Sequence, residues 1–235
     1  MKNMASGYGA LDLSRAAQAQ IIISRKVSKE RLGREPRRVI GLDVSYRGDY
    51  GYAAAVSIDY ATHEIEEIGV SEGMASFPYI PGFLAFREAP LMIKAFLSLK
   101  KREGVLMVNG HGLAHPRRCG IASYLGVVLN MPSIGIARRL LYGEVRREGG
   151  REYIVVDGRY VGIVIGSGRH AIYITIGNKV DIDDLEAIVL KMMPRKGGLP
   201  LPIYWADRIS RQISRGVRSL DSFLKQDGRS IEPRR

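Results

Sequence analysis

The feature that most constrains the fold is a change of hydrophobic period near residue 38. Before it, residues 9–34 place leucine, alanine and isoleucine at helical spacing among basic residues, which predicts a basic amphipathic helix. After it, residues 38–44, 50–60 and 64–70 are short β-rich segments separated by turn residues. Such a pattern is typical of a meander, so we predict three antiparallel strands.

Downstream of the meander, helical and strand-like segments alternate. Pro90 suits the first turn of a helix, and Gly104 is expected to end it. The dipeptide Asp157-Gly158 suits the type I′ turn of a hairpin between residues 153–156 and 160–165. The other predicted elements are strands at 105–108, 133–137 and 171–176 and helices at 119–129, 181–193 and from about 204. We therefore predict an α/β fold with a central mixed β-sheet, three antiparallel strands followed by parallel strands, flanked by helices.

Length and composition indicate the number of domains and the kind of partner that the chain binds. The chain has 235 residues without repeats or a linker, so we expect a single domain over 1–235 with a loose tail at 227–235. A net charge of +12 favours a polyanionic partner, with nucleic acid ahead of a membrane surface. The single cysteine, Cys119, excludes an intrachain disulfide framework and a cysteine-built zinc site. Residues 1–9 lack the apolar core of a signal peptide, and we expect a cytoplasmic protein with no membrane partner.

Three acidic residues stand where they could carry chemistry. Asp43 ends an apolar strand, and a buried acid is costly unless a metal ion or another group pairs with it. The alternative is a strand-end acid that bonds to the next turn. For Glu88 and Asp207 the alternative is an acid at a helix N-terminus, where the macrodipole favours it. Residue types alone leave both interpretations open.

Three motifs, in this order, resemble the endonuclease V family. They are residues 41–46 (GLDVSY), 78–88 (PYIPGFLAFRE) and 109–117 (NGHGLAHPR), and residues 133–138 and Ala206-Asp207 fit the same family. The resemblance covers about residues 11–215. It implies an RNase H-like fold and Mg²⁺-dependent hydrolysis, with Mn²⁺ as a substitute. The expected substrate is nucleic acid that contains hypoxanthine, DNA or RNA, cut at the second phosphodiester bond 3′ to the lesion to give 5′-phosphate and 3′-hydroxyl ends. Such an enzyme repairs deaminated adenine.

The resemblance also assigns roles to residues. It makes Asp43, Glu88, Asn109 and Asp207 the metal-binding set, and hard oxygen ligands of this kind suit Mg²⁺ and activated water. Arg138 completes the catalytic set as a cation near the scissile phosphate, where many members have Lys.

A second group of residues is expected to bind the nucleic acid, together with Arg138. Residues 78–81 correspond to a wedge that fills the gap left by a flipped base: Pro78, Tyr79, Ile80 and Pro81. The alternative is a loop whose tyrosine packs on the body of the protein. The pocket for the flipped base is expected from Gly82, Leu84, Gly110, His115, Gly120 and Ile121. His111 receives no role.

Asn109 departs from the family, which has Asp at this position. An amide is neutral and offers one oxygen, so it is a poorer Mg²⁺ ligand, and we expect impaired activity. The sequence leaves open a natural member with altered chemistry and a variant made to stop turnover. The alternative function is a catalytically inactive protein that binds inosine-containing strands. A third and weaker hypothesis is that the chain is an RNase H-like nuclease without a preference for hypoxanthine.

Overall fold

The computed structural model describes residues 12–194 and 197–217, so the predicted tail at 227–235 lies outside the described residues. In the described ranges the strands form one nine-stranded sheet. Its spatial order is β3 (Ile65–Met74), β2 (Tyr50–Asp59), β1 (Arg38–Arg47), β4 (Val105–Asn109), β5 (Ser133–Ala137), β9 (Ile172–Asn178), β8 (Arg159–Ile165), β7 (Arg151–Val156) and β6 (Glu144–Glu148).

The predicted mixed sheet is confirmed. Strands β3, β2 and β1 are antiparallel, and β4 and β5 continue the sheet parallel to β1. Beyond β5 the direction alternates again, because β9, β8, β7 and β6 each run antiparallel to their neighbour. The Asp157-Gly158 turn joins β7 to β8 with positive φ at both residues, 50° and 71°, as the sequence predicts.

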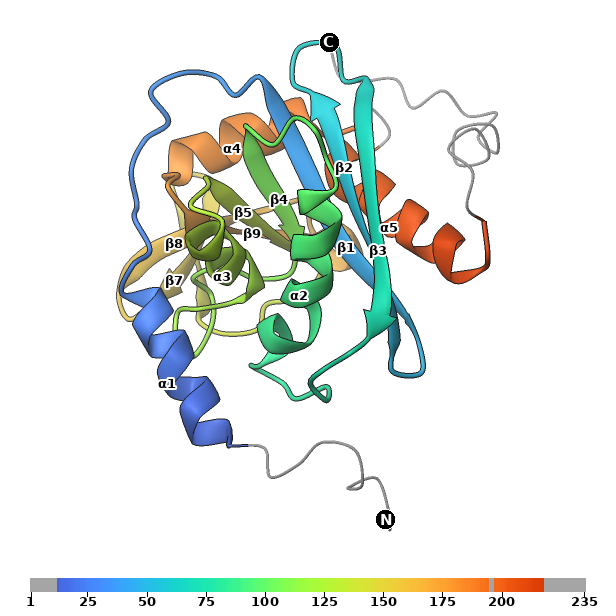
Figure 1. Cartoon of the computed structure of the whole chain (residues 1–235). Coiled ribbons are helices and arrows are strands. Elements are labelled where there is room, and N and C mark those ends of the chain that lie inside the picture. The colour runs from blue at the N-terminus through green and yellow to red at the C-terminus, as the bar shows by residue number, and fades with distance from the viewer. Residues whose placement is uncertain (1–11, 195–196, 218–235) are drawn as a thin grey trace.

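Helices cover both faces of the sheet (Figure 1). Helices α2 (Leu84–Leu97) and α3 (Ile121–Val128) pack on one face, and α4 (Ile182–Lys191) and α5 (Leu201–Ser214) pack on the other. Side chains of β1 alternate between them, with Ile40 and Leu42 facing α2 and Val39 facing the α5 side. No helix of the described ranges combines the length and apolar character needed to cross a bilayer.

The register of β1 against β4 determines where Asp43 and Asn109 lie. Val39 is opposite Val105, and both belong to the core on the α5 side. Because strand side chains alternate, Asp43 and Asn109, each four residues further, point to that same face. Helix α5 approaches β1 closely there: a Cβ at Gly41 would lie 2.0 Å from the Pro202 carbonyl oxygen.

The N-terminal helix differs from its prediction. Helix α1 (Leu13–Ser24) packs against α3, and Asp12 caps it by accepting hydrogen bonds from two backbone amides at 3.1 Å. It ends ten residues before the predicted limit, since the following backbone bonds elsewhere: the Ser28 amide donates to Asn178 and the Leu32 amide donates to Asp184. The predicted apolar face is also wrong, because the buried residue of α1 is the polar Gln20.

Strand β1, helix α2 and strand β6 also differ from the prediction. Strand β1 continues to Arg47, so Asp43 lies inside it and does not end it, and the alternative of a strand-end acid is wrong. Helix α2 begins at Leu84 rather than at Pro90, which lies inside it on the exposed side. Inside a helix Pro90 lacks the N–H of a regular helical hydrogen bond, and the apolar side chains of α2 that pack on the sheet hold the helix together around it. Strand β6 was not predicted, because all five of its residues are exposed and the sequence therefore carries no apolar alternation.

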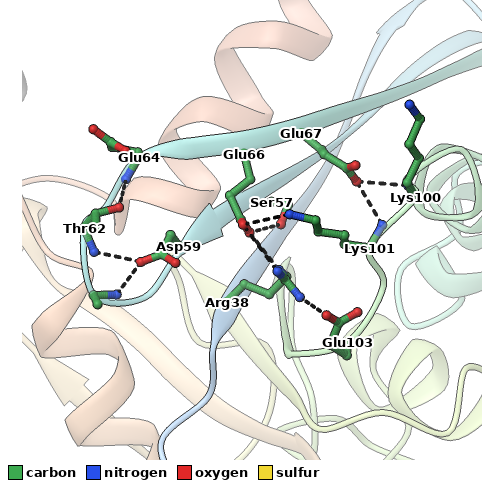
Figure 2. A network of polar contacts seen from close by, with 11 residues as sticks. Arg38, Ser57, Asp59, Thr62, Glu64, Glu66, Glu67, Lys100, Lys101 and Glu103 are labelled. Carbon is green, nitrogen blue, oxygen red and sulfur yellow. Dashed lines mark hydrogen bonds and ion pairs between the residues drawn. The ribbon is translucent and has the colours of Figure 1, made fainter.

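A buried arginine anchors the beginning of β1 (Figure 2). The Arg38 side chain is fully buried, pairs with Glu66 at 2.7 Å and also bonds to Glu103. Ser57 and Lys101 contact the same Glu66 carboxylate at 3.4 and 3.6 Å. This network lies at the start of β1, away from Asp43, so it supports the sheet rather than the candidate site.

Candidate functional site

Polar side chains meet where the middle of β1 and the end of β4 lie against α5. Asn109 Nδ2 donates a hydrogen bond of 2.7 Å to Oδ1 of Asp43, a residue that is 4% exposed. Ser210 of α5 reaches the other carboxylate oxygen of Asp43 at 3.4 Å. The structure therefore places side by side two members of the metal-binding set that the resemblance implies, Asn109 and Asp43.

The charge of Asp207 acts on Asp43, and the charge of Asp43 acts on Glu88. Burial raises the pKa of Asp43 to about 7; the negative charge of Asp207 adds to this rise, and the Asn109 hydrogen bond opposes it. Burial likewise raises the pKa of Glu88 to about 8, with the charge of Asp43 as the second cause. Asp207 itself accepts a hydrogen bond of 2.8 Å from Arg211 Nε.

The position of Glu88 and Asp207 removes the simpler interpretation of both. Helix α2 begins at Leu84 and helix α5 at Leu201, so neither acid caps a helix or lies at its first residue. Each acid lies beyond the first turn of its helix, and each interacts electrostatically with Asp43. An acid in such a position gains little from the macrodipole, whose effect fades beyond the first turn.

The oxygen atoms of this cluster are of the chemical type that binds divalent cations such as Mg²⁺. Asp43, Glu88 and Asp207 supply hard carboxylate oxygens, and burial raises the pKa of the first two, a rise that a nearby cation would oppose. In the described ranges no three His, Cys, Asp or Glu side chains are already grouped closely enough to hold a metal ion. Asn109 is the member that departs, because its Nδ2 occupies one Asp43 oxygen.

A cavity of about 320 Å³ opens directly beyond Asn109. It brings together most of the residues predicted for the wedge and the base pocket: Tyr79, Ile80, Pro81, Gly82, Leu84, Gly110, His115, Gly120 and Ile121. Gly110 has φ 143°, and a Cβ there would lie 2.5 Å from Ile121 Cγ2, so the wall requires glycine. Pro78 and Arg138 are not part of this lining. The lining also includes residues that we did not predict for the pocket, among them Gln20, His111 and Leu141.

One carbonyl on the cavity wall is held by three side chains. The Gly82 oxygen accepts hydrogen bonds from Arg117 Nη2 at 2.6 Å, His115 Nε2 at 3.0 Å and Gln20 Nε2 at 3.1 Å. Gln20 also bonds to the Cys119 carbonyl oxygen at 3.1 Å and accepts from Arg117 Nε at 2.6 Å. Gln20 therefore ties α1 to both walls of the cavity. Sequence reasoning missed it because a glutamine on a helix has no pattern that marks it as buried.

The two histidines of the cavity differ in how many of their ring nitrogens are hydrogen-bonded within the protein. His115 donates to the Gly82 carbonyl through Nε2 and accepts from the Arg117 backbone amide through Nδ1 at 3.1 Å. Burial lowers its pKa to about 4, so the ring is neutral. Because both ring nitrogens are hydrogen-bonded to the cavity wall, His115 can contact a ligand only through the face of its ring. His111 bonds to the Arg139 carbonyl oxygen through Nε2 at 2.8 Å, and burial lowers its pKa as well.

The residues predicted to contact the phosphodiester strand are exposed. Tyr79 is 68% exposed and does not pack on the body of the protein, which was the alternative for this loop. Arg138 directly follows β5, whose Ile136 pairs with Asn109, and its side chain is exposed. Both residues therefore face solvent, and Tyr79 also lines the cavity.

Comparison with known proteins gives a consistent answer. The family model for endonuclease V matches residues 21–208. A relative from Sulfolobus acidocaldarius, described as endonuclease V, is 40% identical over 200 residues, which are 85% of this chain and 94% of the relative. One from Aeropyrum pernix, also described as endonuclease V, is 40% identical over 206 residues, 87% of this chain and 81% of the relative.

Solved structures agree with the sequence comparisons. The crystal structure of endonuclease V from Streptomyces avermitilis has a TM-score of 0.81 and 32% identity, and the match covers 90% of this chain and 96% of that one. Endonuclease V from Ciona intestinalis, solved with DNA that contains an inosine, has a TM-score of 0.77 at 21% identity, over 88% and 99% of the two chains. The second likeness establishes the fold.

The mixed central sheet flanked by helices and the matches to endonuclease V together define an RNase H-like nuclease. Within this class the chain belongs to the endonuclease V family.

Proposed function

We propose that this chain recognises hypoxanthine in nucleic acid and hydrolyses the second phosphodiester bond on its 3′ side, leaving 5′-phosphate and 3′-hydroxyl ends. The proposal rests on one observation: at the end of β4, a residue of the acidic cluster is followed directly by a residue of the cavity wall. Asn109 belongs to the acidic cluster, and Gly110, the next residue, lines the cavity. A base held in the cavity would therefore bring its own strand to the acids.

The cavity and the exposed loop share the work of binding. Tyr79 would fill the position that the extruded base vacates, because an aromatic ring can stack on either neighbouring base. The base would enter the cavity between Gly82 and Gly110, where the Gln20, His115 and Arg117 hydrogen bonds hold the wall rigid. Arg138 would face the phosphate.

Asp43, Glu88, Asn109 and Asp207 would hold Mg²⁺, or Mn²⁺ in its place. A bound divalent cation supplies the charge that activates water and stabilises the leaving oxygen. Asn109 works against this in part, since its Nδ2 holds Oδ1 of Asp43 at 2.7 Å and withdraws that oxygen as a ligand. We therefore expect slow cleavage. The chain is proposed to act as one unit, and both DNA and RNA are candidate substrates.

The test is a cleavage and binding assay on matched DNA and RNA strands with one inosine, and on controls with adenosine. Mg²⁺-dependent nicking of the inosine strands alone, at the second bond on the 3′ side, supports the proposal. Equal cutting of the adenosine controls would instead favour an RNase H-like nuclease without base preference. Equal binding of inosine and adenosine strands would refute hypoxanthine recognition.

Asn109 favours a second candidate, a protein that binds inosine-containing strands without cutting them. Its amide carries no negative charge and offers a single oxygen, and that amide is already engaged with Asp43. Specific binding with no product after prolonged incubation with Mg²⁺ or Mn²⁺ would support this candidate over the nuclease.

A further inference from the structure

One buried ring nitrogen in the cavity wall, Nδ1 of His111, has no hydrogen-bond partner among the described residues. His111 is 9% exposed and lines the cavity, and its Nε2 lies 2.8 Å from the Arg139 carbonyl oxygen. Its other ring nitrogen, Nδ1, is buried and has no hydrogen-bond partner among the described residues. The neighbouring His115 differs, because both of its nitrogens are engaged with the wall.

The partner of Nε2 determines the character of Nδ1. A carbonyl oxygen can only accept, so Nε2 must carry the hydrogen. In the uncharged imidazole Nδ1 then bears a lone pair and acts as an acceptor. A buried acceptor without a partner is costly, and native proteins rarely leave one unless a ligand or water satisfies it. His111 therefore presents a place for a hydrogen-bond donor.

Hypoxanthine and adenine differ in this respect at ring position 1. Hypoxanthine carries an N–H there, whereas adenine has a bare nitrogen with a lone pair. We propose that Nδ1 of His111 accepts a hydrogen bond from N1–H of the flipped hypoxanthine and thereby discriminates against adenine. This inference rests on the proposed function, since it names the residue that would determine its specificity.

Two variants separate the nitrogens of His111. In His111→Gln the amide nitrogen stands near the position of Nε2 and keeps a donor for the Arg139 carbonyl, but the acceptor at Nδ1 is lost. In His111→Asn the amide oxygen stands near Nδ1 and keeps the acceptor, but the Nε2 donor is lost. Comparing the two isolates the acceptor from the general effect of changing the side chain.

The measurement is equilibrium binding of the full chain to single strands that differ at one base: hypoxanthine, adenine, or unsubstituted purine, which has no N1–H. We expect His111→Gln to bind the hypoxanthine strand about tenfold more weakly than the parent, as for one lost hydrogen bond in a buried site. Binding of the purine strand should be unchanged. His111→Asn should keep most of the preference for hypoxanthine over adenine.

The outcomes separate this inference from the proposed function. A His111→Gln variant that keeps the parent's ratio of hypoxanthine to adenine binding overturns the role of His111. A His111→Asn variant that loses the preference as fully as His111→Gln also overturns it. If the parent binds hypoxanthine and adenine strands equally, the proposed function itself fails. Thermal unfolding identifies a variant that does not fold. In that case the parent is compared on hypoxanthine and 1-methylhypoxanthine strands, and equal affinity overturns the N1–H contact.

Discussion

Replacing Asn109 by aspartate tests how the acidic cluster works. In the parent, Asn109 Nδ2 donates to Oδ1 of Asp43 at 2.7 Å, which neutralises part of the cost of burying that acid. Asn109→Asp removes the donor and adds a carboxylate at the same place. The variant therefore gains an oxygen ligand for Mg²⁺ and loses the hydrogen bond that held Asp43 in the absence of a cation.

The expected magnitude follows from the distance. Two ionised carboxylates 2.7 Å apart would repel by about 6 kcal/mol at an effective dielectric constant of 20, so without a cation the pair keeps a proton. A divalent cation removes that repulsion. The variant should thus be less stable than the parent without Mg²⁺ and gain more stability from Mg²⁺. We also expect cleavage to accelerate at least about tenfold, or about 1.4 kcal/mol of barrier.

The assay pairs thermal unfolding over a Mg²⁺ series with single-turnover cleavage of an inosine-containing strand. Asn109→Ala is the matched control, because it loses the hydrogen bond to Asp43 without adding charge. Binding of inosine strands should change little, since Gly110, His115, Gly120 and Ile121 are untouched. If Asn109→Asp cuts no faster than the parent at saturating Mg²⁺, our assignment of position 109 to the metal set is wrong.

Three other variants probe the wedge, the cavity wall and the sheet. Tyr79→Ala should weaken binding to an inosine-containing duplex by about 1–3 kcal/mol and binding to a single strand less, and equal duplex affinity in a titration would remove the wedge role. Gln20→Leu should lower affinity for inosine strands while adenosine strands bind as before, because Gly82 loses one of its three donors; an unchanged preference would make Gln20 purely structural. Glu66→Gln should destabilise the fold at neutral pH by about 1–3 kcal/mol. The Arg38 guanidinium lowers the pKa of Glu66, so this stability is present above the unfolded-state pKa and is lost as pH falls through the folded-state pKa. Denaturant unfolding should show the parent and the Gln variant converging in acid, and a constant difference would contradict the ion-pair explanation.

Local patterns predicted the sheet well and the contacts of its helices poorly. The meander, the two parallel strands and the Asp157-Gly158 turn follow from alternation and turn chemistry, which act over a few residues. Strand β6 has no buried side chain and therefore no such signal. Gln20 is buried by hydrogen bonds to residues 62 and 99 positions away, which no helical period can encode.

The candidate site was predicted from motif resemblance more than from residue chemistry. Residue types alone left open whether Glu88 and Asp207 are helix-start acids, and the structure shows that both helices start several residues upstream of them. The register of β1 and β4 then brings Asp43 and Asn109 together. The free nitrogen of His111 depends on a backbone carbonyl 28 positions away, so only the folded chain reveals it.

The buried Arg38 has a consequence for the fidelity of folding. A slip of β1 by one residue would exchange its two faces, moving Asp43 in among the apolar side chains of α2 and α3 and turning Leu42 toward α5. The same slip would carry the Arg38 guanidinium away from Glu66 and leave a charge stranded in the core. Each misregistered state therefore loses the ion pair at the start of the strand and misplaces the acid in its middle. In this way a charge pair remote from the acids selects the one alignment in which they meet.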